Sequence, residues 1–202
     1  MTHLPVNQKT RIRVIQLGAL SLLFAVMTMN PGFNGDGSDT VEKIGVGLVL
    51  FCVVGRMWSI LYIGTRKNLT LVTTGPYSIT RNPLYLFSAI GAMGVGLFVG
   101  SLLLALSLGL VAWVVLGVTA SKEAAYLETL FGDEYRQYAL RTPIFWPRPS
   151  LYREPVDGVV FSPAALRQTF LDGLVFIAVL PAIEVLEHLR DAGYMPILFN
   201  LL

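Results

Sequence analysis

Charged side chains are scarce in this sequence. They make up 14% of its 202 residues, whereas hydrophobic residues make up 54%, and the mean hydropathy is +0.63. A soluble domain typically carries about 25% charged residues. The composition therefore favours a single integral membrane domain, residues 1–202, over a soluble protein. The net charge of +2 gives no reason to expect a nucleic-acid partner.

Cysteine and histidine are nearly absent. The one cysteine, Cys52, lies in an apolar run and has no partner for an internal disulfide. The two histidines, His3 and His188, lie near opposite ends of the chain, and no H-x-x-x-H pattern is present. Zinc sites need three or four His, Cys or carboxylate ligands placed close together. We therefore expect no metal site.

The sequence also lacks a nucleotide-binding glycine signature. The pairs Gly45-x-Gly47 and Gly94-x-Gly96 lie in apolar runs, without a preceding strand or a following acidic residue. Close packing of helices explains glycines at such positions better. A methyltransferase or dehydrogenase domain of the soluble type is therefore not expected.

Apolar runs dominate what is present. Five such segments stand out: Val14–Met29, Ile44–Ile63, Leu84–Val99, Leu102–Ala120 and Phe170–Val185. A membrane-spanning helix needs about 20 residues, so the sequence predicts an all-α transmembrane bundle of about five spans. The first segment follows a basic stretch, as a signal peptide would. It lacks a small-x-small cleavage site, so we expect it to be retained.

The longest stretch without charge, Asn82 to Ser121, has forty residues. This is too long for one span and suits a hairpin, residues 84–120, with its turn at Val99-Gly100-Ser101. Arg81 and Lys122 then emerge on the same side. Alternating spans place twelve basic residues on that side: Lys9, Arg11, Arg13, Arg66, Lys67, Arg81, Lys122, Arg136, Arg141, Arg148, Arg153 and Arg167. Only Lys43 and Arg190 fall on the other, so the positive-inside rule predicts a cytoplasmic N terminus.

Two segments outside the spans have distinct patterns. Glu123–Arg141 has the apolar spacing of an amphipathic helix, interrupted at Phe131-Gly132, and such a helix can simply lie on lipid headgroups. The segment Thr142–Ser162 and the Pro163 after it hold five prolines, which exclude a continuous helix. We expect an ordered connector into a last span and tail, residues 163–202, whose helix begins with Ser162 as cap.

Two motifs flank the hairpin, within residues 73–86 and 121–147. GPYSITRNPLY, which starts at Gly75, resembles the G-P-Y-x-x-x-R-[HN]-P-x-Y motif of the isoprenylcysteine carboxyl methyltransferase and phospholipid methyltransferase families. EAAYLETLFGDEYRQYALRTP, which starts at Glu123, resembles their second motif, E-E-x-x-L-x-x-x-F-G-x-x-Y-x-x-Y-x-x-x-x-P. Three positions differ from parts of these families: Asn82 stands where eukaryotic members have His, Ala124 stands at the second Glu of the second motif, and Ile144 stands where many members have Arg after the final Pro. Asn at the position of Asn82 is found in bacterial relatives, so the resemblance implies a bacterial inner-membrane protein.

The resemblance implies S-adenosylmethionine as cofactor and methyl transfer to a lipid-like or prenylated acceptor. The acceptor enters from the bilayer and is methylated at the cytoplasmic face, on a carboxylate or an amine. The implied cofactor-binding residues are Tyr77, Arg81, Asn82, Pro83, Tyr85, Glu123, Tyr135, Tyr138 and Arg141. A guanidinium can grip the cofactor's carboxylate with two hydrogen bonds, and tyrosine faces suit its sulfonium cation. Glu123 can accept hydrogen bonds from the cofactor's ribose and adenine. It is also a candidate catalytic residue, because an amine acceptor that arrives protonated needs a base, which Glu123 or a tyrosine would supply.

Arg56 is the second candidate catalytic residue. It lies about 10 Å from the cytoplasmic end of the second predicted span. A lipid-facing arginine is costly at that depth. Arg56 therefore either faces the bundle and contacts a ligand, or extends its side chain to the interface. The sequence leaves both open.

Two other functions remain open. Sterol-reductase-like membrane enzymes share a similar pair of motifs, but they bind a nicotinamide cofactor and have more spans. A non-catalytic membrane protein that retains the fold would also explain the departures at Asn82, Ala124 and Ile144. Cofactor binding separates the three.

Overall fold

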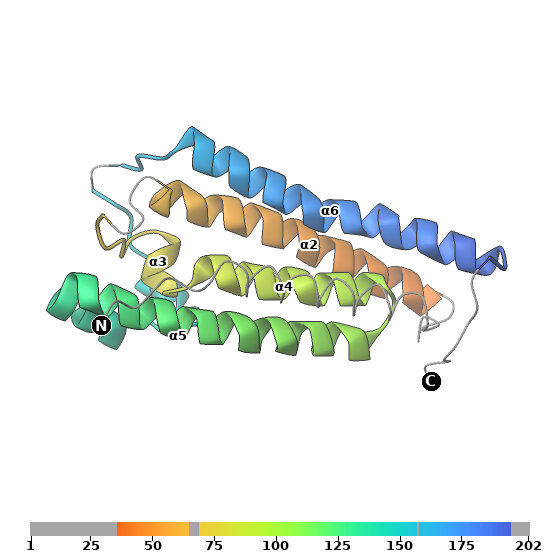
Figure 1. The fold of residues 1–202 in the computed structure, drawn as a ribbon, viewed down its shortest axis with the longest axis horizontal. Coiled ribbons are helices and arrows are strands. Elements are labelled where there is room, and N and C mark those ends of the chain that lie inside the picture. The colour runs from red at the N-terminus through yellow and green to blue at the C-terminus, as the bar shows by residue number, and fades with distance from the viewer. Residues whose placement is uncertain (1–35, 65–68, 157, 195–202) are drawn as a thin grey trace.

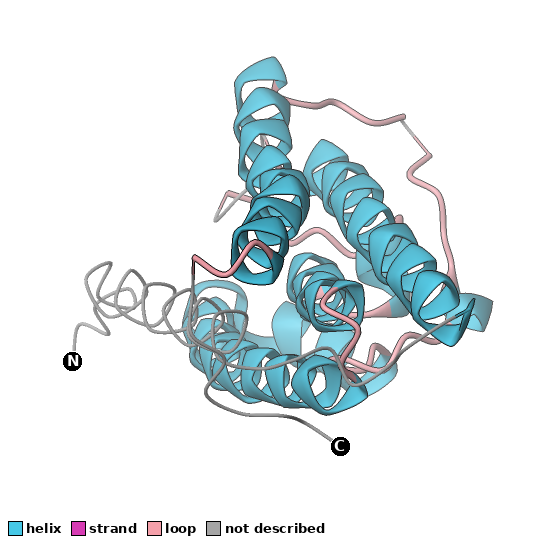
Figure 2. Ribbon diagram, turned by 90° about the vertical axis from the view of Figure 1, so that its right-hand side faces the viewer, coloured by secondary structure: helices cyan, strands magenta, loops and turns pink. Residues whose placement is uncertain are grey.

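The structure, a computed structural model, describes residues 36–64, 69–156 and 158–194 (Figure 1). The helices of these residues are α2 (Asp36–Ile63), α3 (Pro76–Ile79), α4 (Pro83–Phe98), α5 (Leu102–Arg141), the 3-10 turn η1 (Pro149–Leu151) and α6 (Pro163–Asp191). No strand occurs among the described residues (Figure 2). The expected all-α class is confirmed. The predicted first span, Val14–Met29, lies outside the described residues.

Three of the described helices, α2, α5 and α6, are long and apolar enough to cross a membrane. The fourth long helix, α4, is apolar but has only 16 residues. At 1.5 Å per residue it is about 24 Å long, slightly less than the hydrocarbon core of about 30 Å. It packs against α2, α5 and α6, and eight of its 16 residues are buried.

The long helices run antiparallel to their neighbours in sequence (Figure 1). α6 packs mainly against α2. The end of the bundle that carries the α4–α5 loop, the start of α2 and the end of α6 is called the hairpin end below. The opposite end carries α3, η1 and the last turns of α5, and is called the capped end.

The predicted hairpin is present. α4 ends at Phe98 and α5 begins at Leu102, with Gly100 in the turn at φ 71°. Ser101 caps α5, since its Oγ accepts a hydrogen bond from the Leu104 amide at 3.2 Å. The two helices touch at Gly96, where a Cβ atom would lie 2.3 Å from the Ala105 Cα. The turn therefore brings the two motifs to the same end of the bundle.

Close contact between α2 and α4 also depends on glycine. A Cβ atom on Gly45 would lie 2.7 Å from the Gly94 carbonyl oxygen, and one on Gly55 would overlap the Phe87 ring. The packing interpretation is thereby supported for Gly45 and Gly94. Gly47 has nothing within 4 Å of its Cβ position, so it takes no part in this contact.

α5 differs from the expectation in its extent. The predicted span and the amphipathic segment form one helix of 40 residues, because no Gly or Pro separates Ala120 from Glu123. The predicted interruption is confirmed at Gly132, whose φ of 52° and ψ of −123° lie in a region that only glycine adopts easily. The kink turns the last two helical turns of α5 over the capped end.

The connector and α6 follow the expected pattern. Within the connector's described residues, only η1 is helical. Ser162 caps α6, since its Oγ accepts from the Ala165 amide at 3.3 Å. α6 begins at Pro163, seven residues before the predicted apolar segment.

Candidate functional site

The first motif is covered by the proline-rich connector. The Gly75 amide donates to the Arg153 carbonyl at 2.7 Å, the Arg148 amide to the Ile79 carbonyl at 2.9 Å, and the Arg81 amide to the Pro143 carbonyl at 2.8 Å. Gly75 has a φ of 59°, and a Cβ atom there would overlap the ring of Tyr62. The connector thus fixes the motif through backbone hydrogen bonds that tolerate many side chains.

Asn82 takes part in the same contact. It stands at the N-cap position of α4, but its side chain makes no capping hydrogen bond. Its Nδ2 instead donates to the Ile144 carbonyl at 3.1 Å. The Asn82 side chain therefore binds the connector and does not cap α4. Two of the positions that depart from the family motifs, Asn82 and Ile144, are thus in direct contact.

Residues of the two motifs meet between the start of α4 and α5. The Tyr85 hydroxyl donates to Glu123 Oε2 at 2.9 Å, and Arg81 Nη1 donates to the Tyr135 hydroxyl at 3.4 Å. The residues of each pair are 38 and 54 positions apart. The hairpin and the kink at Gly132 bring them together.

A buried aromatic cluster completes this region. The Tyr138 hydroxyl donates to the Tyr77 carbonyl at 2.7 Å, and the Tyr135 and Tyr138 rings meet edge to face with centroids 6.1 Å apart. Burial raises the pKa of Tyr77 well above its ordinary value, and the neighbouring Tyr138, Glu123 and Tyr85 raise it further. The Tyr77 phenol therefore keeps its proton and can act as a hydrogen-bond donor.

Two buried donors in this region have no partner. The Tyr77 hydroxyl and Arg81 Nε make no hydrogen bond to any described residue. Leaving such a group unsatisfied costs about 1–3 kcal/mol. Both belong to the first motif, and the Tyr77 phenol lies close enough to Glu123 and Tyr85 for their charges to affect it. Two such unused buried donors are expected where a polar ligand binds.

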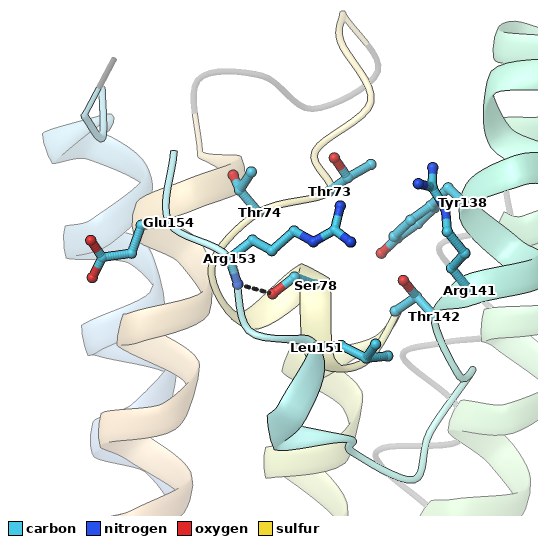
Figure 3. A pocket seen from close by; sticks show the side chains of 9 residues that line it. All are labelled: Thr73, Thr74, Ser78, Tyr138, Arg141, Thr142, Leu151, Arg153 and Glu154. Atoms are coloured by element: carbon cyan, nitrogen blue, oxygen red, sulfur yellow. Dashed lines mark hydrogen bonds between the residues drawn. The ribbon is translucent and has the colours of Figure 1, made fainter. Parts of the chain in front are cut away.

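A pocket of about 170 Å³ lies beside Tyr138 (Figure 3). Its lining is rich in hydroxyl and guanidinium groups: Thr73, Thr74, Ser78, Tyr138, Arg141, Thr142, Leu151, Arg153 and Glu154. The Arg153 side chain extends from the connector toward Thr73 and Tyr138. Its backbone amide donates to Ser78 Oγ at 3.0 Å. The pocket adjoins the tyrosine cluster through Tyr138 alone.

Three of the predicted cofactor-binding residues do not join this cluster: Asn82, which binds the connector, Pro83 and Arg141. Arg141 is exposed, and its Nε donates to the Gln137 carbonyl of its own helix at 3.2 Å. It contacts neither Arg81 nor Glu123 but lines the pocket, because it follows Tyr138 by one turn. Pro83 is buried as the first residue of α4 and offers no polar group. The predicted residues that the structure does gather are Tyr77, Arg81, Tyr85, Glu123, Tyr135 and Tyr138.

Arg56 faces the interior of the bundle. Its Nη1 donates to Ser88 Oγ of α4, and its guanidinium lies 6.0 Å from the centroid of the Phe176 ring of α6. Its Nε is buried without a partner among the described residues. The bundle-facing alternative is therefore the one that the structure supports.

Three groups that contact predicted site residues were not predicted from the sequence: Ser88, Phe176 and the Ile144 carbonyl. Ser88 is a polar residue in an apolar segment, three positions after Tyr85, and this pattern could have identified it. Phe176 and the Ile144 carbonyl could not have been found, because one is an ordinary apolar residue and the other a backbone atom. No group of three or more His, Cys, Asp or Glu side chains in the described part of the chain could hold a metal ion.

Comparison with known proteins agrees with the two motifs. The model of the family described as phospholipid methyltransferase matches residues 42–134, from the second turn of α2 to just after the kink in α5. The chain belongs to this family. It is 36% identical to the protein-S-isoprenylcysteine O-methyltransferase of Schizosaccharomyces pombe over 77 residues. These aligned residues make up 38% of this chain and 33% of that protein. With three apolar helices of spanning length, the chain is an integral membrane member of a methyltransferase family.

Two other family relatives match over more of the chain. The cobalt-zinc-cadmium resistance protein CzcN of Cupriavidus metallidurans is 36% identical over 156 residues, 77% of this chain and 70% of that protein. The nickel-cobalt-cadmium resistance protein NccN of Alcaligenes xylosoxydans xylosoxydans is 35% identical over 159 residues, 79% of this chain and 74% of that protein. No solved structure matches the chain.

Proposed function

We propose that this methyltransferase-family protein uses S-adenosylmethionine to methylate a lipid-like or prenylated acceptor at the cytoplasmic membrane face. The observation that carries the proposal is the cluster of motif residues at the capped end. In that cluster Glu123 accepts from Tyr85 and Arg81 donates to Tyr135. Tyr77 and Arg81 each keep a buried donor free of any described partner.

The chemistry of this donor set fits the cofactor. Arg81 supplies a planar cation with an unused nitrogen, which suits a carboxylate. Tyr77, Tyr85, Tyr135 and Tyr138 supply ring faces and hydroxyls, which suit a sulfonium cation and ribose hydroxyls. A ligand that accepts hydrogen bonds from Tyr77 and Arg81 would also remove two unsatisfied buried groups.

When bound, S-adenosylmethionine supplies an activated methyl group. The protein's residues then have to hold the cofactor, position the acceptor and exclude water, so orientation supplies much of the acceleration. Tyr85 orients the Glu123 carboxylate through its hydrogen bond. A carboxylate acceptor needs no base, so Glu123 then serves only to orient the bound ligand. With a protonated amine acceptor, Glu123 takes the proton from nitrogen.

We propose further that the capped end faces the cytoplasm. It carries Lys122, Arg136, Arg148, Arg153 and Arg167, whereas Lys43 is the basic residue with a described side chain at the hairpin end. This asymmetry supports the orientation by the positive-inside rule. An enzyme reporter fused after Leu202 should be active only outside the cytoplasm, and cytoplasmic activity would contradict the orientation.

The test of the function is calorimetric titration of S-adenosylmethionine, and of its demethylated product, into the detergent-purified protein. We expect binding, and we expect Arg81→Ala and Glu123→Ala each to weaken it by about tenfold or more, because each loses a hydrogen bond to a charged group. Arg136→Ala and Glu134→Ala are the matched controls on the exposed face of α5. They should bind as the native protein does.

Two results would contradict the proposal. If the folded protein binds neither compound, the methyltransferase proposal fails, and reduced nicotinamide becomes the next ligand to titrate. If binding is unchanged in both Arg81→Ala and Glu123→Ala, the site assignment fails. The names of CzcN and NccN make growth in cobalt, zinc or cadmium a suitable cellular assay for the same variants.

A further inference from the structure

Arg56 carries a positive charge inside the apolar bundle. Its position on α2 is seven residues before the helix ends at Ile63, about 10 Å along the axis. Its partner Ser88 lies five residues inside α4, about 8 Å from the start of that helix. The side chain is therefore held across to α4 and does not extend to the interface. A charge at this depth is costly unless it is compensated.

No described carboxylate compensates this charge. The ion pairs formed by described residues involve Arg136 with Glu128 and Asp133. α4 contains no acidic residue, and Glu42 precedes Arg56 on α2 by 14 residues, about 21 Å. On α6, Asp172 is exposed and accepts from Gln168 at 2.9 Å.

The remaining acidic residues do not alter this picture. Outside the described part of the chain the one acidic residue is Asp157, which precedes the start of α6 by six residues, since residues 1–35, 65–68 and 195–202 contain neither Asp nor Glu. Glu184, Glu187 and Asp191 follow Phe176 on α6 by eight residues or more, at least about 12 Å toward the hairpin end. Glu123 is engaged by Tyr85. The described neighbours of the guanidinium are thus the Ser88 hydroxyl, the Phe176 ring and the Cys52 thiol one turn earlier on α2, and none of them is a carboxylate. The charge of Arg56 therefore remains available to an anion.

The surroundings of Arg56 are also rigid. A Cβ atom on Gly55 would overlap the Phe87 ring, and one on Gly173 of α6 would lie 3.0 Å from Val53. These contacts fix α4 and α6 against the turn of α2 that carries Arg56. Ser88 is held in turn, since its Oγ donates to the Leu84 carbonyl at 2.8 Å. Binding sites on such packed helices hold their ligands in a defined geometry.

The subsite adjoins the candidate cofactor site. Ser88, which binds Arg56, follows Tyr85, which binds Glu123, by three positions on α4. Residues at this spacing lie on the same helix face, about 4.5 Å apart along the axis. Arg56 is thus about one helical turn deeper in the bundle than the Tyr85–Glu123 pair.

From these observations we propose that Arg56, Ser88 and Phe176 form an intramembrane anion-binding subsite that selects bilayer-borne acceptors carrying a carboxylate or a phosphate. The guanidinium binds the anionic oxygens, Ser88 orients it, and Phe176 faces its remaining side. This deepens the proposed function and rests on it, because it assigns a charge to the acceptor. Arg56 is a specificity-determining residue in this scheme.

The test uses Trp58 as a built-in reporter, since it lies two residues after Arg56 and contacts the Phe87 ring at 6.5 Å. Trp113 and Trp146 are exposed and are first replaced by Phe. Quenching of Trp58 is then titrated in uncharged detergent with two pairs of brominated lipids. One pair is a long-chain carboxylic acid and its methyl ester, at a pH where the acid is ionised. The other is phosphatidic acid and diacylglycerol with the same chains.

We expect the anionic member of at least one pair to bind about tenfold more tightly than the neutral member. The pair that shows the difference identifies the anion as carboxylate or phosphate. Arg56→Gln should abolish the preference. Arg167→Gln, on the exposed side of α6, is the matched control and should retain it. Equal binding within both pairs, or a preference that persists in Arg56→Gln, would overturn the proposal.

Thermal unfolding will show whether Arg56→Gln folds. If it does not, two further variants test the proposal. Arg56→Lys keeps the charge and should keep a reduced preference, while Ser88→Ala should lower it without removing the charge. An unchanged preference in both overturns the proposal. The lipid titrations contain no cofactor, so they are independent of the calorimetry. Cofactor binding without a lipid preference refutes the subsite alone, and the reverse result refutes the proposed cofactor.

Discussion

The hairpin end and the capped end are built from the same long helices, but they differ in their interiors. The hairpin end is filled by apolar contacts, whereas the capped end contains buried hydrogen-bond donors without a described partner. At the hairpin end the interior is closed by glycine contacts and by an apolar cluster that includes Val49, Val95, Phe98 and Ile183. At the capped end, Tyr77 and Arg81 each bury a donor that meets no described partner. One end is thus complete as a packed structure, whereas the other still has hydrogen bonds to offer a ligand.

The largest expected effect is a loss of stability when the packing of the hairpin end is disturbed. In Gly45→Ala the new methyl group would lie 2.5 Å from the Phe98 amide nitrogen, on a backbone that cannot yield easily. Overpacking of this kind typically costs about 1–3 kcal/mol. We expect a clear fall in the thermal unfolding temperature in detergent.

Gly47→Ala is the matched control for this change. It lies two residues along the same helix, and its Cβ position has nothing within 4 Å. It should unfold at or slightly above the native temperature, because alanine favours helix over glycine. Equal losses in the two variants would mean that the α2–α4 contact is not the cause.

A second comparison separates stability from binding within the capped end. Tyr138→Phe removes the donor to the buried Tyr77 carbonyl and should lower the free energy of unfolding by about 1–2 kcal/mol. Tyr77→Phe removes a hydroxyl that has no described partner, so it should not lower stability but should weaken cofactor binding. Thermal unfolding and calorimetry on both variants check this. A stability loss in Tyr77→Phe as large as that in Tyr138→Phe would contradict it.

The contact between Asn82 and the connector allows a third, smaller test. Asn82→Asp replaces the Nδ2 donor with a carboxylate that faces the Ile144 carbonyl. We expect a loss of about 1 kcal/mol in unfolding free energy. Asn82→His restores the residue of the eukaryotic motif and keeps a donor, so it should lose less. If the two variants unfold alike, the Asn82 hydrogen bond contributes nothing measurable.

The smallest effect is on the pH dependence of stability. The raised pKa of Tyr77 means that its phenol stays neutral in the folded protein after tyrosines in the unfolded chain begin to ionise. Below a pH of about 10 this residue adds no pH dependence. Above it the unfolded state loses the proton first, so the free energy of unfolding should fall as pH rises. Denaturant titrations at high pH should show a shallower fall in Tyr77→Phe, and an equal slope would count against the raised pKa.

Sequence and structure agreed most closely where one local signal was enough. Gly100 marked the turn of the hairpin, Gly132 marked the kink, and the prolines after Thr142 marked the end of α5. The extent of α5 was not foreseen, because apolar and amphipathic patterns join without a helix breaker. Arg141 lies within the second motif, yet the structure places it at the pocket with Tyr138, because helical spacing alone does not fix which face a kinked helix presents.

The sequence by itself determined the membrane class, the hairpin and the pairing of the two motifs, since these depend on hydrophobicity, chain length and residue type. Only the tertiary structure decided which donors remain unsatisfied, where Arg56 points and which connector carbonyl binds Asn82. These features depend on distances between atoms far apart in the chain. The physical reason is that the demand of a buried polar group for a partner is local, but its partner is supplied by whichever helix or loop the fold brings within reach.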